Sequence, residues 1–565
     1  MLAGNLPFEI QAAILDHLNS VSRIQYSLVS RHWRQAARHV LFKTIQLRSE
    51  KEVDAFADLL LESSSLGESV RKLVFKTPAS MNEAQQYSAL IRLTPNLQIL
   101  ETGRHANRLY QVAVEEIEHG HWQHLHAIND SMILYDYESM TAHELEQIRG
   151  TGPDYYALAS ALRDRLSAVK LDVTSERDSP FEPHCFQPPF YITRQTRFKA
   201  LENLVCFSEE KTAIRSLDSA LSLCPHATEV TFSLCYFHSC EDNRIQFRPN
   251  TTVTTVHVFA SRLTEASLNY LLHKFLNVKQ LIIRILDYDD DEYDEDRIGP
   301  FEIPTEMATQ LAYYACTTEK FDIWFRGLMN NVQLFVAFTL VRWQGEMQVN
   351  LQSHYIQFEH DRSKPKHSGL YLCLDVTSLD LRQPSVRAYF NQLDVLSIGQ
   401  IGLEHYPLLT HCTQLQELHM QYGHLSAYDG PYLPIRSLVV SYGNYNINFL
   451  RQLSALTPHL KNARLTFNAS SKVKIDMPSI SFDSLYLIIA QPQEESPFYF
   501  HLTQFGKDRY YQAIENQLYE MEADEFKKHE PVPNKAKVIC KGIKHLEIHR
   551  RVNGPLNRLI LHTFL

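Results

Sequence analysis

Apolar residues recur every three or four positions in three consecutive segments near the start of the chain. This spacing places them on one face of a helix, so it predicts three short amphipathic helices. Pro7 suits the first turn of the first helix, where no N–H is needed, and Ser20 and Ser30 are possible N-caps of the next two. The three segments are residues 7–18, 20–28 and 30–41.

These helices form a module that is too small to be stable on its own. About forty residues bury too little apolar surface for a stable independent domain. We therefore expect several of its apolar side chains to pack against another chain or the next domain. They are Leu6, Ile10, Trp33, Leu41 and Phe42.

After Leu47 the pattern changes to short strand-like units of the form L-x-x-L-x-L, in which any apolar residue can occupy each L. The middle positions are 26, 26 and 25 residues apart in one series, and 22, 20, 25 and 22 apart in a second. The first series has the middle residues Leu204, Val230, Val256 and Leu281. The second has Leu396, Leu418, Leu438, Ala463 and Leu485, and further copies centre on Leu73 and Leu546.

Helical segments lie between these strands, for example residues 214–221 and 447–453, each ending shortly before a proline. A strand and a helix every 20 to 27 residues cannot cover their own apolar faces, so successive units must stack. The pattern predicts an α/β solenoid with parallel strands over residues 49–565.

Three stretches interrupt this period. Residues 105–153 contain no clear strand unit, and residues 175–189, with four prolines, predict an extended loop. Residues 287–296 hold eight acids in ten positions, which predicts a solvated loop, with a docking element for a basic partner as the alternative.

Composition limits the classes of function. The chain is 44% hydrophobic and 21% charged, which is typical of a globular protein, and 65 acidic residues against 55 basic ones give no sign of nucleic-acid binding. No apolar run reaches the ~20 residues of a membrane-spanning helix, and the start lacks a signal-peptide pattern. Nine scattered cysteines favour reduced thiols. We therefore expect a protein of the cytoplasm or nucleus without a membrane partner.

No motif for catalysis or for cofactor binding is present, so we expect neither an enzyme nor a cofactor. Two clusters could in principle hold zinc, but the first has a spacing that fits no common structural zinc site. The second straddles the turn of a repeat, where its cysteines are expected to be buried packing residues. The clusters are His119, His121, His124 and His126, and Cys235, His238 and Cys240.

The order of residues in the helical module, Leu6-Pro7-x-Glu9-Ile10, Leu28-Val29-Ser30, Trp33-Arg34 and Leu41-Phe42, resembles the F-box. The F-box docks a Skp-type adaptor in cullin-RING ubiquitin ligases. Phe42 stands where the family often has Trp. The resemblance covers residues 1–48, and the alternative is a helical cap that binds nothing. It implies an adaptor interface, or the packing that shapes it, made by Leu6, Pro7, Ile10, Ile14, Leu18, Val29, Trp33, Leu41 and Phe42.

The repeats in turn resemble the leucine-rich repeats of F-box proteins, a horseshoe with strands on its concave side, although the Asn or Cys usual after each strand is met only at Cys235. Together the two resemblances imply a non-catalytic substrate receptor of an SCF-type ubiquitin ligase, which recruits a protein substrate. A non-ligase F-box scaffold and a leucine-rich-repeat GTPase-activating protein remain open.

Side chains alternate along a strand, so the residue between the last two apolar positions of each unit points away from the core. In the second series this gives a stripe of Ser397, His419, Val439, Arg464 and Tyr486. We expect the substrate to bind there, chiefly through His419, Arg464 and Tyr486. An unused sheet face, with substrates bound by loops or the C-terminal tail, is the alternative.

Overall fold

The computed structural model describes the greater part of the chain, in two compact units, Met1–Gly299 and Pro300–Leu565. No helix among the described residues is long and apolar enough to cross a membrane. The described ranges are 6–75, 84–102, 106–130, 153–173, 197–238, 248–285, 302–326, 331–341, 343–352, 355–372, 383–401, 406–423, 431–441, 447–468, 473–491, 498–514, 517–529, 535–552 and 556–563.

The first unit opens with the three predicted helices, α1 (Phe8–Asp16), α2 (Ser20–Ser27) and α3 (Arg31–Phe42). Ser30 caps α3 as predicted, because its hydroxyl accepts a hydrogen bond from the Trp33 N–H. The prediction that Ser20 caps α2 is wrong by one residue: Asn19 is the cap and accepts from Ser22. Helices α1 and α3 share a small buried core of Leu15, Trp33, Ala36, Ala37 and Val40, and no residue of α2 is buried.

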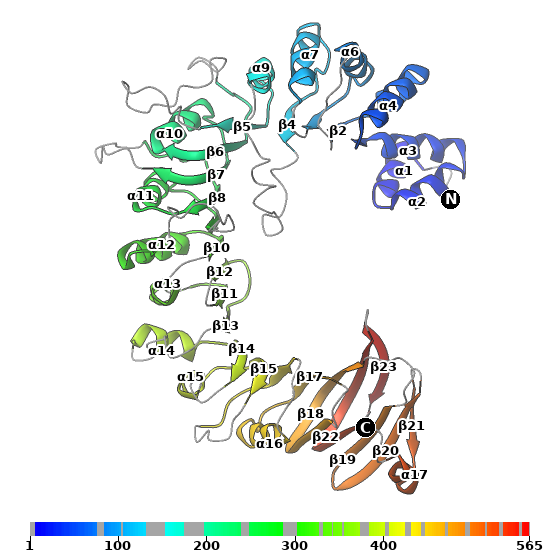
Figure 1. The fold of residues 1–565 in the computed structure, drawn as a ribbon, viewed down its shortest axis with the longest axis vertical. Coiled ribbons are helices and arrows are strands. Elements are labelled where there is room, and N and C mark those ends of the chain that lie inside the picture. The colour runs from blue at the N-terminus through cyan, green and yellow to red at the C-terminus, as the bar shows by residue number, and fades with distance from the viewer. Residues whose placement is uncertain are drawn as a thin grey trace, which may run out of the picture. The chain divides into compact units, whose positions relative to one another are not determined.

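The rest of this unit alternates strands and helices, and strands β1 to β9 pair in chain order, all parallel. The helices lie along one face of the sheet (Figure 1). The elements are β1 (Thr44–Leu47), α4 (Glu50–Glu62), α5 (Ser64–Gly67), β2 (Lys72–Phe75), α6 (Ala84–Leu93), β3 (Ile99–Thr102), α7 (Asn107–Glu118), β4 (Ala127–Asp130), α9 (Pro153–Ala161), β5 (Ala168–Asp172), β6 (Asn203–Ala213), α10 (Ile214–Leu223), β7 (Glu229–His238), β8 (Thr255–Arg262), α11 (Glu265–Lys274) and β9 (Gln280–Ile285).

The strand register agrees with the predicted repeat. The middle residues Leu204, Val230, Val256 and Leu281 lie side by side on neighbouring strands, and all four are buried. Each unit therefore contributes one apolar side chain to the same buried row, which a single unit could not cover.

The expectation that residues 105–153 hold no strand unit is wrong, because they contain α7 and β4, and β4 pairs with β3 and β5. Leu125 and Ile128 fill the first two positions of the unit there, but Asp130 occupies the third. The polar third position hides the unit from a search for apolar residues. Residues 175–189 and 287–296 lie outside the described part of the chain.

In the second unit, helices α12 to α16 also lie along one face of the sheet (Figure 1). Its strands follow the order β10, β12, β11, β13, β14, β15, β16, β17, β18 and β22, and β19 and β23 both pair with β22. The elements are α12 (Thr305–Thr317), β10 (Lys320–Arg326), α13 (Asn331–Thr339), β11 (Glu346–Leu351), β12 (Tyr355–Asp361), β13 (His367–Leu372), α14 (Pro384–Asn391), β14 (Val395–Ile401), α15 (Tyr406–His411), β15 (Glu417–Gly423), β16 (Ser437–Val440), α16 (Ile447–Leu456), β17 (Asn462–Asn468), β18 (Val473–Gln491), β19 (Phe498–Gln504), β20 (Lys507–Ile514), β21 (Gln517–Met521), α17 (Ala523–Lys528), β22 (Lys535–Val552) and β23 (Leu556–Thr563).

The expected fully parallel arrangement is wrong in this unit at two places. Strand β12 runs antiparallel to both β10 and β11. The connection from Leu351 of β11 to Tyr355 of β12 is too short for the crossover that a parallel neighbour needs. Beyond β18, strands β19, β20 and β21 form an antiparallel meander, and β23 is antiparallel to β22. From β13 to β18 the strands are parallel, as predicted.

Candidate functional site

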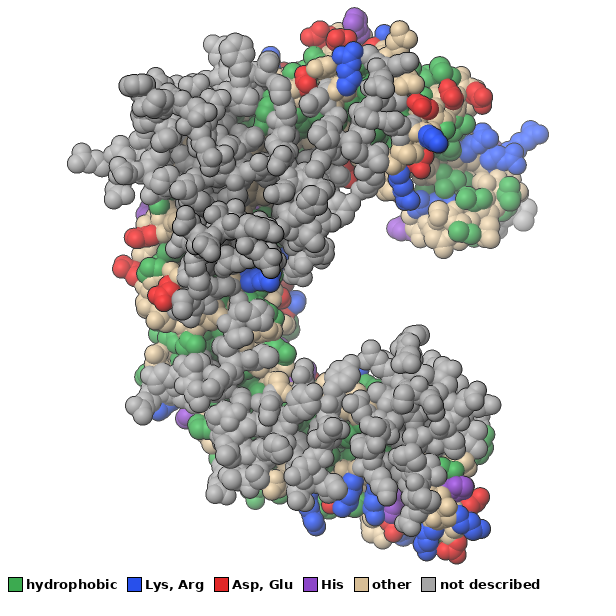
Figure 2. All heavy atoms as spheres, viewed as in Figure 1, with side chains coloured by type: hydrophobic (Ala, Val, Ile, Leu, Met, Phe, Trp, Pro, Cys, Tyr) green, Lys and Arg blue, Asp and Glu red, His purple; other side chains and the backbone are tan. Residues whose placement is uncertain are grey.

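The three N-terminal helices carry an unusual share of exposed apolar side chains. Eight of the sixteen large apolar residues that are exposed in the described chain lie between residues 8 and 29. Figure 2 shows hydrophobic side chains on the surface of this module. A concentration of exposed apolar side chains on one small module is typical of an interaction site. The eight are Phe8, Ile10, Ile14, Val21, Ile24, Tyr26, Leu28 and Val29.

Polar contacts hold the helices that present this surface. The Arg23 guanidinium donates to the carbonyl oxygens of Leu15 and Asp16, both at 2.8 Å, and so ties α2 to the C-terminal end of α1. Lys43 Nζ lies 2.9 Å from Asp16 Oδ2 and ties the end of α3 to the same point. The hydrogen bond from Lys43 lowers the pKa of the Asp16 carboxyl from its usual value. These contacts bring the C-terminal end of α1, helix α2 and the end of α3 together at one point.

The predicted adaptor-binding residues fall into three groups by exposure. Pro7, Ile10, Ile14 and Val29 are exposed, whereas Leu6, Leu18, Leu41 and Phe42 are half-buried. Trp33 is only 4% exposed and packs against Tyr26 and the core, so it shapes the module from inside.

Five of these exposed residues are not among the nine that the resemblance to the F-box assigns to the interface. They are Phe8, Val21, Ile24, Tyr26 and Leu28. The signal for all five is the shortage of buried partners in so small a module. Their side chains extend the exposed apolar surface from α1 over α2.

A second candidate surface lies on the sheet of the second unit, on the side away from its helices. The register places the predicted stripe residues Ser397, His419, Val439, Arg464 and Tyr486 next to one another on five consecutive strands. Arg464 is exposed and the other four are half-buried. The structure thus brings the predicted substrate residues His419, Arg464 and Tyr486 into one row.

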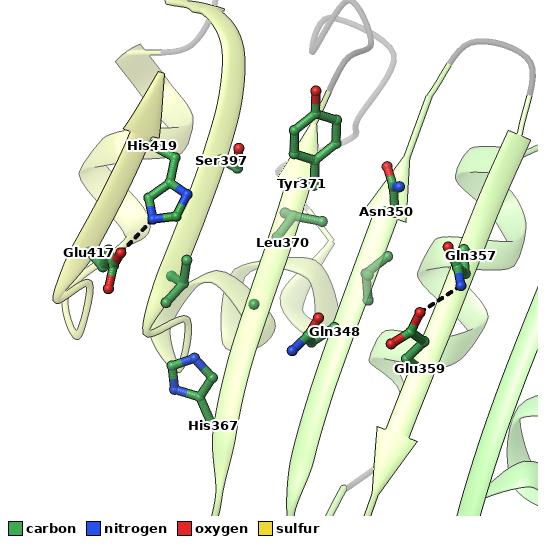
Figure 3. Close-up of a pocket in the computed structure, with 13 residues that line it drawn as sticks. Gln348, Asn350, Gln357, Glu359, His367, Leu370, Tyr371, Ser397, Glu417 and His419 are labelled. Atoms are coloured by element: carbon green, nitrogen blue, oxygen red, sulfur yellow. Dashed lines mark hydrogen bonds and ion pairs between the residues drawn. The ribbon is translucent and has the colours of Figure 1, made fainter. Parts of the chain in front are cut away.

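The row continues into a hollow. In the direction of β11, Ser397 is followed by Tyr371 and then by Asn350. These three residues and His419 line a hollow of about 600 Å³ that spans the neighbouring strands β12, β11, β13, β14 and β15 (Figure 3). The hollow also includes two hydrogen-bonded carboxylates: Glu417 accepts from His419 Nε2 at 2.5 Å, and Glu359 accepts from Gln357 Nε2 at 2.6 Å.

The two clusters that could hold zinc gain no support from the structure. Among the described residues, no group of three or more His, Cys, Asp or Glu side chains is placed to hold a metal ion. His119, His121, His124 and His126 follow α7 and lead into β4, and Cys235 and His238 lie in β7. Cys240 falls outside the described residues.

Comparison with known families agrees with the helical module. Residues 4–45 match the family model of the F-box domain. The chain therefore carries an F-box domain, which is generally the Skp-binding module of receptors in SCF ubiquitin ligases. The match does not extend to the repeats. No curated protein matches the chain.

Proposed function

We propose that this protein is a substrate receptor of an SCF-type ubiquitin ligase. The F-box would hold a Skp-type adaptor, and through it a cullin-RING ligase, while the sheet of the second unit holds a protein substrate. The observation that carries the proposal is the exposed apolar surface of α1 and α2 within a segment that matches the F-box domain. A monomer gains nothing from leaving such residues as Leu28 (74% exposed) in water.

We further propose that both units are built from degenerate leucine-rich repeats. The support is the register of the buried apolar row, in which Leu396, Leu418, Leu438, Ala463 and Leu485 are consecutive neighbours. Strand, helix and strand then recur with the period of such repeats, and the antiparallel strands are additions to this plan.

In this role the protein has no active site of its own. It raises the rate of ubiquitin transfer by holding a substrate lysine near the ubiquitin-loaded enzyme, which makes a bimolecular encounter effectively intramolecular. The cytoplasm and the nucleus are the compartments we propose for it.

The test has two stages. Affinity purification with mass spectrometry should recover a Skp-type adaptor and candidate substrates. Reconstitution with purified cullin-RING ligase should then show ubiquitylation of a recovered substrate that depends on this protein. Adaptor binding without ubiquitylation of any partner would instead identify a non-ligase scaffold.

A triple variant, in which His419, Arg464 and Tyr486 are all changed to Ala, tests whether the sheet of the second unit binds the substrate. The row lies on the surface, so we expect this variant to fold, to keep the adaptor and to lose the substrates. Retention of every substrate would place recognition elsewhere on the protein.

A further inference from the structure

The hollow on the sheet of the second unit is centred on a glycine. Gly369 on β13 lies between Gln348 of β11 and Val395 of β14 in the register. Its neighbour Leu370 is buried on the helix side, so the missing side chain of Gly369 would point to the open side. A Cβ atom placed there would have Gln348 Cγ as its nearest neighbour, at 3.7 Å. The hollow therefore exists because one side chain is absent from an otherwise continuous row.

The rim of the hollow is polar and carries aromatic rings on two sides of this gap. His367 and Tyr371 lie two residues before and after Gly369 on the same strand and on the same face (Figure 3). Gln348 and Asn350 supply amide oxygens from β11. A planar group resting on Gly369 would thus have rings at its two ends and hydrogen-bond acceptors along one side.

The charges of the lining are one-sided. It contains the carboxylates of Glu359 and Glu417, and no Lys or Arg is among the described residues that line it. The two carboxylates stand on β12 and β15, four strand spacings apart, or roughly 19 Å. They are too far apart to share one metal ion, but each of them favours a cationic group over an anionic one nearby.

We propose that this hollow binds an arginine side chain of the substrate, an inference that rests on the proposed receptor function. A guanidinium is planar, always charged, weakly hydrated and able to stack on aromatic rings while donating to amide and carboxylate oxygens. A volume of about 600 Å³ holds the arginine together with flanking peptide atoms. A phosphorylated or acidic segment would be repelled by the two carboxylates, and it would find no Lys or Arg among the described residues of the lining.

The test uses the purified full chain, immobilised, and four pools of nine-residue peptides. Each pool has Arg, Lys, Gln or Glu fixed at the central position and random residues elsewhere. We expect the Arg pool to be retained about fivefold more than the Gln or Glu pool at low salt, with Lys between them.

Gly369→Leu fills the hollow from its floor. The backbone at Gly369 has an ordinary φ and the site has room for a Cβ, so we expect the variant to fold and to lose the preference for Arg. The matched control is Ser484→Leu, which adds similar bulk on β18, outside the hollow, at a half-buried position of the same face. It should retain the preference.

The double variant Glu359→Gln, Glu417→Gln provides a second route that does not depend on added bulk. It should narrow the difference between the Arg and Gln pools. Equal retention of all pools, stronger retention of the Glu pool, or a preference that survives both the Leu and the double Gln variants would overturn the proposal. Adaptor binding, measured in parallel, keeps the two questions apart: intact adaptor binding with no Arg preference refutes only the arginine site, and absent adaptor binding refutes the receptor function.

Discussion

The sequence does not distinguish the structural role of Trp33 from that of Leu28. Both are apolar residues of the F-box pattern, yet Trp33 is 4% exposed and Leu28 is 74% exposed. Helical spacing identifies apolar positions but cannot tell which of two apolar faces the module itself covers. The motif therefore assigned Trp33 to the interface or to the packing that shapes it, and it left out Leu28. Only the packing in the structure separates structural residues from surface residues.

This separation makes a first prediction. Leu28→Ala and Val29→Ala should each weaken adaptor binding by about 1–2 kcal/mol without changing the melting temperature, because both side chains are already in water in the free protein. Trp33→Ala should instead lower the free energy of unfolding of the module by about 3–5 kcal/mol. Titration calorimetry and thermal denaturation measure the two effects. A loss of stability in Leu28→Ala comparable to that in Trp33→Ala would contradict the assignment.

A second prediction concerns Asp361, at the end of β12. Its carboxylate accepts hydrogen bonds from Ser363 and pairs with Lys320 Nζ at 3.0 Å, and these contacts lower its pKa to about 2. The folded pKa lies below the unfolded value of about 3.9, so the stabilisation is present above about pH 4 and is lost as the pH falls towards 2. The difference in melting temperature between wild type and Asp361→Asn should be constant from pH 7 to 5 and shrink below pH 4. A difference that stays the same down to pH 2.5 would show that this carboxylate is not held ionised.

Among the elements, the repeat units that the sequence predicts all have apolar residues at the three positions of the strand. The repeat units that the pattern did not identify depart from it in one of two ways. Thr102 fills the third position in β3, where it is 1% exposed and bonds with the hydroxyl of Tyr110. The strand β5 fits the pattern fully with Leu166, Val169 and Leu171, but insertions on both sides move it away from the regular spacing. A buried polar residue or an insertion thus hides a unit without breaking the sheet.

The corner between helix and strand is a shared element of the two units. The Leu-Thr-Pro sequence ends α6 at Leu93 and α16 at Leu456, and in each case the threonine hydroxyl donates to the carbonyl four residues earlier at 2.8 Å. Both threonines are buried, but Thr94 also accepts a hydrogen bond from the indole of the fully buried Trp122 at 3.0 Å.

That extra bond gives a third prediction. Thr457→Val should change the free energy of unfolding by less than about 1 kcal/mol, since valine keeps the shape and the carbonyl keeps its backbone partner. Thr94→Val should cost roughly 1–3 kcal/mol because it leaves the Trp122 N–H buried without an acceptor. Urea denaturation of each variant measures both values, and equal costs would mean that the indole finds another partner.

Over the whole chain, the sequence predicted the class of fold because a repeat imposes its order on every unit. It could not predict the antiparallel strands β12, β19 to β21 and β23, since a short connection or a hairpin reverses a strand without changing its apolar pattern. The candidate sites divide in the same way. The F-box follows from a local motif, while the hollow around Gly369 depends on five neighbouring strands and on a side chain that is absent.

The central claim is that the exposed surface of α1 and α2 docks a Skp-type adaptor, and the most direct test is the dissociation constant of the two purified proteins. We expect the wild-type chain to bind with a Kd of about 1 µM or tighter. The double variant Ile10→Asp, Ile14→Asp should bind about 100-fold more weakly, because it sets two charges into the apolar contact. The control is Leu61→Asp, which changes an exposed apolar residue on α4, outside the F-box, and should leave the Kd unchanged. No binding by the wild type, or equal binding by the Ile10→Asp, Ile14→Asp variant, would contradict the account.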